Sequence, residues 1–265
     1  MKEITLGQYY PANSKLHALD PRVKLFATLV YIITLFSFDG PITFVIIAVT
    51  LGGIIKLSHV PFSYMVKGLK GIITLLIIAG LFNLFLTPGA TLVSFGIFKI
   101  TDVGLKNAVI MTLRMIFLII GTSIMTLTTT PNQLTDGLEK SLGFLKKIGV
   151  PVHEIAMMMS IALRFIPILV EETDKIMKAQ MARGADFETG GLIKKAKAMV
   201  PLLVPLFVSA FRRANDLALA MEARCYNGGE GRTKMKPLKY SDLDQRAYIC
   251  IVMFIILFYL VKAVV

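Results

Sequence analysis

A nearly uncharged apolar run from Leu25 to Ile55 constrains this chain more than any other feature, because it holds a single charged residue, Asp39. A helix needs roughly 20 mostly apolar residues to cross a bilayer, and this run is long enough for two. Asp39 lies in the sequence Phe-Asp-Gly-Pro, whose residue types favour a tight turn. The run therefore predicts two membrane-spanning helices joined by a hairpin, about Val23–Phe38 and Ile42–Lys56.

Three further stretches have the length and apolar character of spans, about Gly71–Thr87, Leu105–Leu127 and Ala247–Val265. The segment Leu57–Lys70 carries several polar residues and is interpreted as a connector near the membrane interface. The stretch Ala90–Thr101 is apolar but too short to cross the membrane as a helix. We expect a small hairpin or an irregular loop there, on the far side of the membrane.

The sequence changes character after Thr128, where apolar and charged residues alternate at helical spacing as far as Tyr240. Thr130-Pro131 predicts a helix start, because a cap residue precedes a proline of the first turn. Beyond it, the spacing predicts two long amphipathic helices with internal prolines that bend them. They cover Val152–Arg183, bent at Pro167, and Leu192–Arg224, bent at Pro201 and Pro205.

The composition fits this division, with 55% hydrophobic residues and a net charge of +12. A basic chain could bind nucleic acid. Because this chain is predicted to span the membrane, however, we expect it to contact the lipid bilayer and not to bind nucleic acid. Seventeen of the 29 Lys and Arg residues lie between Thr128 and Asp244, so that segment and the N-terminus are expected on the cytoplasmic side. The predicted fold class is all-α, with about five transmembrane helices and a cytoplasmic domain of long amphipathic helices. Its predicted parts are residues 1–127 with four spans, residues 128–245 outside the membrane, and residues 246–265 with the last span.

The two long amphipathic helices end in matching sequences, Ala182-Arg183-Gly184 and Ala223-Arg224-Cys225. We call them the Arg183 tip and the Arg224 tip. Residues that break helices follow each arginine, so each guanidinium is expected at the end of its helix. A planar guanidinium suits a carboxylate-lined groove on a partner protein, which it can bind bidentately. The alternative is a cation that complements the helix dipole, worth about 0.3–1 kcal/mol. Two matched endings favour the partner site.

These motifs resemble the transmembrane, or T, component of energy-coupling factor transporters. The resemblance covers nearly the whole chain, and the passages that carry it are residues 16–24 (LHALDPRVK), the stretch 101–105, residues 161–167 (IALRFIP), 179–187 (AQMARGADF) and 220–226 (AMEARCY). The second tip departs from the Ala-Arg-Gly signature, because Cys225 stands where the signature has glycine. This departure weakens the expectation of a tight turn at that tip.

The resemblance implies a plasma-membrane protein of a prokaryote that works in a complex. Arg183 and Arg224 would bind grooves on two ABC-type ATPase subunits, which would carry ATP and Mg. The long helices would be coupling helices that contact a small membrane protein, the S component, which binds a vitamin or similar micronutrient. Closure of the ATPases would draw the two tips towards each other and reorient the S component.

Five more residues are candidates for coupling or for contact with the S component. For the methionines, core filling is an equal alternative, although an adaptable side chain suits varied partners. For the arginine at 164 the alternative is a surface charge. A charge inside a span is costly, so Arg114 has a functional role by default, and pairing with Asn83 or snorkelling are the alternatives. The five candidates are Met157, Met158, Arg164, Pro167 and Arg114.

Motifs for catalysis are missing from the sequence. It contains no phosphate-binding loop of the form GxxxxGK[ST] and no serine elbow, and its three histidines lie apart from one another. We therefore expect no catalytic residue, no metal site and no cofactor in this chain. The rival function is a stand-alone secondary transporter, but repeated halves and acidic residues at mid-membrane, which would favour it, are missing from the predicted spans. An intramembrane enzyme is the third possibility.

Overall fold

A computed structural model describes residues 9–37, 40–95, 98–187, 191–229, 235 and 237–264, and these residues divide into two compact units. The first unit, residues 1–140 with 238–265, contains α1 (Lys15–Ala18), α2 (Pro21–Ser37), α3 (Pro41–Ser58), α4 (Phe62–Lys70), α5 (Ile73–Leu86), β1 (Thr91–Phe95), β2 (Phe98–Thr101), α6 (Asp102–Thr128), α7 (Pro131–Ser141, whose last residue begins the second unit) and α10 (Asp242–Val264). The second unit, residues 141–237, contains the 3₁₀ helix η1 (Gly143–Ile148), α8 (Val152–Ala182) and α9 (Leu192–Glu222).

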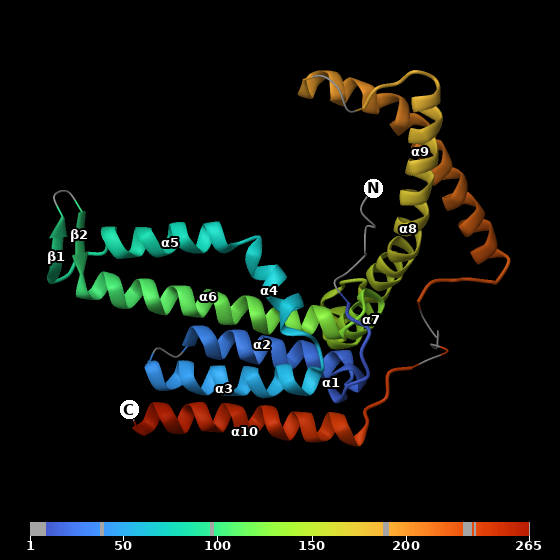
Figure 1. The fold of residues 1–265 in the computed structure, drawn as a ribbon. Coiled ribbons are helices and arrows are strands. Elements are labelled where there is room, and N and C mark those ends of the chain that lie inside the picture. Colours follow the sequence, from blue (N-terminus) through green and yellow to red (C-terminus); the bar gives the residue numbers. More distant parts are fainter. Residues whose placement is uncertain are drawn as a thin grey trace. The chain divides into compact units, whose positions relative to one another are not determined.

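Helices dominate both units, which confirms the predicted all-α class. In the first unit α2, α3, α5, α6 and α10 run side by side (Figure 1). Their packed core is formed by Leu35, Phe44, Ile47, Leu51, Val60, Met65, Ile120, Ile124, Leu127 and Phe258. The two units are defined by packing, whereas the predicted boundaries at 127/128 and 245/246 concern position relative to a membrane. Those boundaries stay a prediction.

Among the described residues, four helices are long and apolar enough to span a membrane, α3, α6, α8 and α10, and a fifth if α4 and α5 count as one bent span. The predicted number of about five is therefore confirmed. The third span differs from its prediction, because α5 has only 14 residues, about 21 Å of helix. α4 precedes it at an angle of 62° to α5. The break between the two helices, at Gly71-Ile72, lies next to the predicted boundary between the connector and the third span.

Two helices fall near the limits of a span. α2 has 17 residues, about 26 Å, which is at the lower end of what crosses a bilayer. α8 qualifies by length and apolar content, although we expected it outside the membrane. The physical reason is its uneven composition: the first half is mostly apolar, and after Val170 come Glu171, Glu172, Asp174, Lys175 and Lys178.

Local predictions are confirmed at three places. The stretch Ala90–Thr101 forms an antiparallel hairpin in which Phe95 pairs with Phe98. α7 begins at the predicted Thr130-Pro131, where Thr130 Oγ1 accepts from the Gln133 amide and the Gln133 side chain accepts from the Thr130 amide, a capping box. α2 ends at Ser37 and α3 begins at Pro41, as the predicted hairpin requires. Phe38 and Asp39 of its turn lie outside the described residues.

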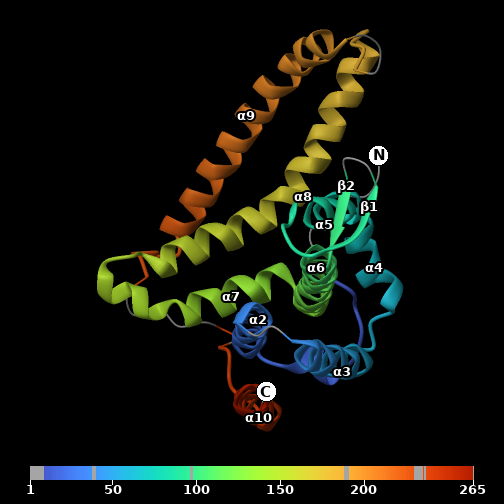
Figure 2. The same ribbon diagram turned by 90° about the vertical axis from the view of Figure 1, so that its left-hand side faces the viewer.

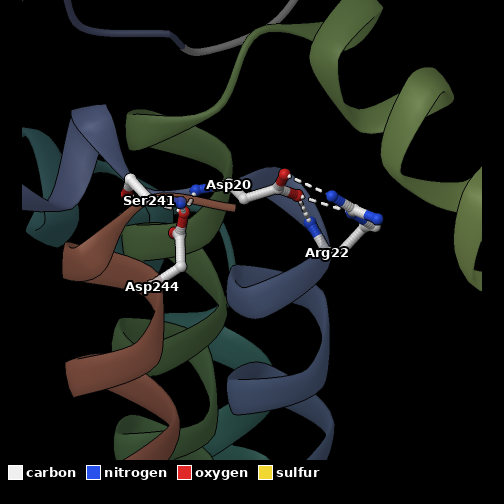
Figure 3. Close-up of polar contacts among 4 residues, drawn as sticks. All are labelled: Asp20, Arg22, Ser241 and Asp244. Carbon is white, nitrogen blue, oxygen red and sulfur yellow. Dashed lines mark hydrogen bonds and ion pairs between the residues drawn. The ribbon is translucent and has the colours of Figure 1, made fainter. Parts of the chain in front are cut away.

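The starts of α2 and α10 are joined by a group of polar contacts around two buried carboxylates, which we call the N-terminal clasp: Asp20, Arg22, Ser241 and Asp244 (Figure 3). One Asp244 oxygen accepts from the Asp20 amide at 2.8 Å, and the other accepts from the Ser241 amide and hydroxyl, both at 2.8 Å. The Arg22 guanidinium donates to both Asp20 oxygens at 3.0 and 2.8 Å and forms an ion pair with this carboxylate. It also lies 3.9 Å from the centre of the Tyr240 ring.

Lys24, one turn into α2, extends this link to α6. Its ammonium donates to the carbonyl oxygen of Thr128, the last residue of α6, at 2.9 Å, and to that of His17 at 3.3 Å. A cation at a helix C-terminus satisfies a carbonyl that the helix itself leaves open. The motif at residues 16–24 thus ties the first, fourth and last apolar helices of this unit together.

Removing the central carboxylate of the clasp is expected to destabilise the first unit. Asp244→Ala leaves the buried Asp20 amide without its acceptor, and a buried donor without a partner costs about 1–3 kcal/mol. The Ser241 amide also loses its acceptor, but Ser241 is exposed and water can replace it. Thermal unfolding of the purified chain in detergent measures the loss. Asp242→Ala is the matched control, because Asp242 lies in the same first turn of α10 but is exposed. Equal midpoints for the two variants would contradict the role of the clasp.

The clasp also predicts a dependence of stability on pH. Burial of Asp20 would raise the pKa of its carboxyl, but hydrogen bonds from the Arg22 side chain and backbone outweigh it and hold the pKa below its ordinary value. A depressed folded-state pKa contributes stability at any pH above the unfolded value, about 3.9, and loses it as the pH falls through the folded value. We expect the unfolding midpoint to fall below about pH 4, and to fall less in Asp20→Asn.

Candidate functional site

The second unit consists mainly of α8 and α9, which pack on each other and run in opposite directions (Figure 2). Arg213 of α9 donates to the Glu172 carboxylate of α8 at 3.3 Å. The buried Leu202 marks the packed face of α9. Both helices have the predicted extents to within two residues and contain the predicted prolines, which confirms the two long amphipathic helices.

The Arg183 tip is a tight helix end closed by a glycine. Gly184 has a φ of +90°, in the left-handed region that suits a residue without a Cβ. Its amide donates to the Met181 carbonyl, and the amide of Ala185 donates back to Gln180. These two bonds form a Schellman turn. Arg183 is thus the last residue before the chain reverses, and its side chain is exposed.

The Arg224 tip has the same turn, although a cysteine replaces the glycine. Cys225 has a φ of +54°, its amide donates to the Glu222 carbonyl, and the amide of Tyr226 donates to Met221. The spacing of these bonds from the arginine is identical to that at the first tip. The substitution of cysteine therefore does not loosen the turn, and Arg224 is exposed at a helix end of the same geometry.

The two tips are expected to respond oppositely to exchanges at the left-handed residue. Gly184→Ala places a Cβ where L-residues pay about 1–2 kcal/mol, whereas Cys225→Gly removes that cost. Hydrogen exchange read by mass spectrometry measures both effects at the amides of Ala185 and Tyr226, which close the turns. We expect faster exchange in the first variant and slower exchange in the second. A change of the same sign at both tips would contradict the equivalence of the turns.

The tips lie at opposite ends of the α8–α9 pair. Arg224 and Cys225 line a pocket of about 650 Å³ together with residues from the first half of α8, among them Met157 and Arg164. Arg183 ends α8, about 30 Å farther along the helix at 1.5 Å per residue. The pocket is lined by Met157, Ser160, Ile161, Arg164, Phe165, Leu217, Met221, Arg224, Cys225, Tyr226, Asn227 and Gly228.

The remaining candidates are scattered. Met158 is 58% exposed on α8, and Pro167 lies inside the same helix. Arg114 belongs to the first unit, in α6, where it is 8% exposed and its guanidinium lies 5.5 Å from the centre of the Phe36 ring. The amide of Asn83, the partner considered for Arg114, donates to Ala79 of its own helix. Arg114 thus belongs to a different unit from the other four candidates, and the predicted coupling contacts stay a prediction.

An exposed apolar stripe on α9 was missed by our reading of the sequence. Its members recur at intervals of three and four residues, which places them on one helix face. Each is at least 49% exposed, and single apolar side chains are common on surfaces whereas a continuous stripe marks an interaction site. The interval was visible in the sequence, but the packed face of α9 is equally apolar. The stripe consists of Met199, Val200, Leu203, Val204, Phe207, Val208 and Phe211.

Comparison with known proteins places the chain in a family. The family described as "Cobalt transport protein" matches residues 12–235. The chain is 56% identical over 255 residues to an energy-coupling factor transporter transmembrane protein of Clostridium kluyveri, covering 94% of this chain and 93% of that protein. Proteins of the same description from Thermosediminibacter oceani and Bacillus subtilis are 51% and 46% identical, covering 94% and 99% of this chain and 94% and 100% of their own lengths. The chain therefore belongs to the family of energy-coupling factor transporter transmembrane proteins, multi-pass proteins of the bacterial cell membrane.

Proposed function

We propose that this chain is the coupling subunit of an ATP-driven importer, which transmits the movement of two ABC-type ATPase subunits to a substrate-binding S component. The observation that carries the proposal is the pair of identical turns that expose Arg183 and Arg224 at opposite ends of α8–α9. Each arginine is the residue directly before the left-handed residue of its turn, so both guanidinium groups leave their helices at the same point of the same turn. Two equivalent tips suit two related partners.

Each tip would bind one ATPase subunit. The guanidinium belongs to the last residue of its helix, so no loop separates the helix from the ATPase subunit that the arginine would bind. A guanidinium fork binds a carboxylate bidentately, so a groove lined with acidic residues is its natural partner. ATP and Mg would be held by the ATPases, and this chain would have no catalytic residue of its own.

The S component would contact the apolar stripe on α9. A membrane protein offers apolar helices, and seven exposed apolar side chains in line provide the complementary surface. The S component, and not this chain, would select the substrate, a vitamin or similar micronutrient. α8 and α9 would lie on the cytoplasmic side, where the excess of basic residues belongs.

In this mechanism α8 and α9 act as levers. When ATP closes the two ATPases, the tips follow the grooves in which they are bound, and the angle between the helices changes. The prolines inside both helices remove backbone hydrogen bonds, so bending is easiest at those positions. The stripe on α9 moves with the helix and reorients the S component in the bilayer.

Reconstitution separates this function from a stand-alone carrier. The chain is purified in mild detergent with the proteins that accompany it, and liposomes are made with the complex and with the chain alone. We expect uptake of the solute bound by the accompanying small membrane protein only with the complex and only with ATP and Mg. Uptake by the chain alone without nucleotide would replace the proposal with a secondary transporter.

A further inference from the structure

The pocket beside Arg224 distinguishes the two tips, although their turns are identical. It is formed where the end of α9 packs against the first half of α8, so it brings Arg164 and Arg224 to one site from positions 60 residues apart in the chain. None of the described residues that line it carries a carboxylate. Two guanidinium groups therefore share the pocket without a negative charge among its lining residues.

The rest of the lining is divided by chemistry. The side chains of Tyr226 and Asn227 also belong to the lining, whereas the Ser160 hydroxyl already donates to the Ala156 carbonyl at 2.9 Å. Ile161 and Phe165 belong to an apolar wall. A small inorganic anion would use the guanidinium groups but not this wall. A volume of about 650 Å³ also exceeds what one small anion fills. The lining fits a carboxylate that is attached to an apolar group.

We propose that this pocket is a socket for an acidic side chain and its apolar neighbour on the ATPase subunit that binds the Arg224 tip, with Arg164 as the second cation of the site. The inference rests on the proposed function and extends it. The Arg224 tip enters a groove of its partner while the partner inserts a side chain beside the tip. Arg164 is thus assigned to ATPase binding instead of to the S component.

The socket gives the two tips different specificities. Arg183 ends its helix about 30 Å from the socket, so a partner bound there cannot use Arg164. An ATPase with an acidic residue at the matching position would bind the Arg224 end more tightly than one without it. If the two ATPase subunits differ, this contact fixes which of them occupies which end.

Cys225 makes the socket accessible to direct measurement. It lines the pocket and is exposed, and Cys250 is the only other cysteine of the chain. In a Cys250→Ala background, N-ethylmaleimide therefore reports on Cys225 alone. We expect rapid alkylation of the isolated chain and at least about tenfold slower alkylation in the complex with the ATPase pair, because the inserted side chain blocks the thiol.

The deciding variants are Arg164→Gln and Arg164→Lys, compared with Lys178→Gln, which removes an exposed charge from the same helix outside the pocket. We expect Arg164→Gln to weaken binding of the ATPase pair about tenfold or more and to restore alkylation of Cys225. Arg164→Lys should bind the ATPase pair with an affinity between those of Arg164→Gln and the unchanged chain, because lysine keeps the charge but cannot bind a carboxylate bidentately. Lys178→Gln should bind as the unchanged chain does. Arg164 is exposed, so its loss does not threaten folding.

Three results would overturn the socket. If Arg164→Gln binds normally while Arg224→Glu does not, the socket is wrong and the coupling function stands. If Arg164→Gln weakens binding but Cys225 stays protected, Arg164 acts elsewhere. Protection of Cys225 by inorganic phosphate alone would assign the arginines to a phosphate group instead. Normal binding by both Arg183→Glu and Arg224→Glu would refute the proposed function itself.

Discussion

Exchanging both tip arginines for glutamate, Arg183→Glu with Arg224→Glu, is expected to abolish ATP-driven uptake while leaving the chain folded in the membrane. Each exchange turns an attraction to an acidic groove into a repulsion, and like charges at an interface cost several kcal/mol. The folded state should tolerate the change, because both side chains are exposed and the turns are held by backbone hydrogen bonds. Uptake into liposomes and co-purification of the ATPase pair are the two measurements.

The single variants and a charge control make this test specific. Each single exchange should leave one ATPase subunit attached through the other tip. We therefore expect a single variant to bind the ATPase pair more weakly and to lose coupled uptake, while some complex can still be purified. Lys175→Glu changes the charge of α8 by the same amount at an exposed site about 12 Å before Arg183 along the helix, and it should keep uptake. Full uptake by the double variant at normal expression would show that the tips do not transmit the force.

The tips illustrate what a sequence can and cannot predict. The position of each arginine could be predicted from local sequence, because an amphipathic helix that is followed by helix-breaking residues exposes its last side chain at the helix end. The turn at Cys225 did not follow, since a cysteine gives no signal for a positive φ. The hydrogen bonds from Cys225 to Glu222 and from Tyr226 to Met221 impose that conformation on a residue that does not favour it.

Contacts between segments that are far apart in the chain could not be predicted from the sequence, for a different reason. The socket depends on the antiparallel packing of α9 on α8, and no local pattern relates Arg164 to Arg224. The same holds for the N-terminal clasp, where the acceptor of the Asp20 amide, Asp244, lies 224 residues away. The break between α4 and α5 was nearer to local sequence, because the predicted boundary between connector and span, Lys70-Gly71, lies directly before it.

A single charge in the apolar stripe of α9 is expected to have the second large effect. Phe207 is 61% exposed, so Phe207→Glu does not disturb the packed face that contains Leu202. In a complex, the new carboxylate would be buried against an apolar partner with no cation to pair with, which costs several kcal/mol. We expect the small membrane protein to be lost from the purified complex and uptake to stop, while both ATPase subunits stay bound through the tips.

The controls for the stripe separate its apolar character from the charge of α9. Phe207→Leu keeps an apolar side chain and should retain the small membrane protein. Asp216→Lys alters the net charge more strongly, but Asp216 is exposed and lies about 180° around the helix axis from Phe207, off the stripe. If Phe207→Glu retains the S component, the stripe on α9 is not the surface to which the S component binds. Loss of the ATPases together with the S component would mean that α9 had been disrupted as a helix, which circular dichroism of the purified chain would show. Loss of the S component alone would establish that ATPase binding and S-component binding occupy separate parts of one lever, which is what transmission of force between them requires.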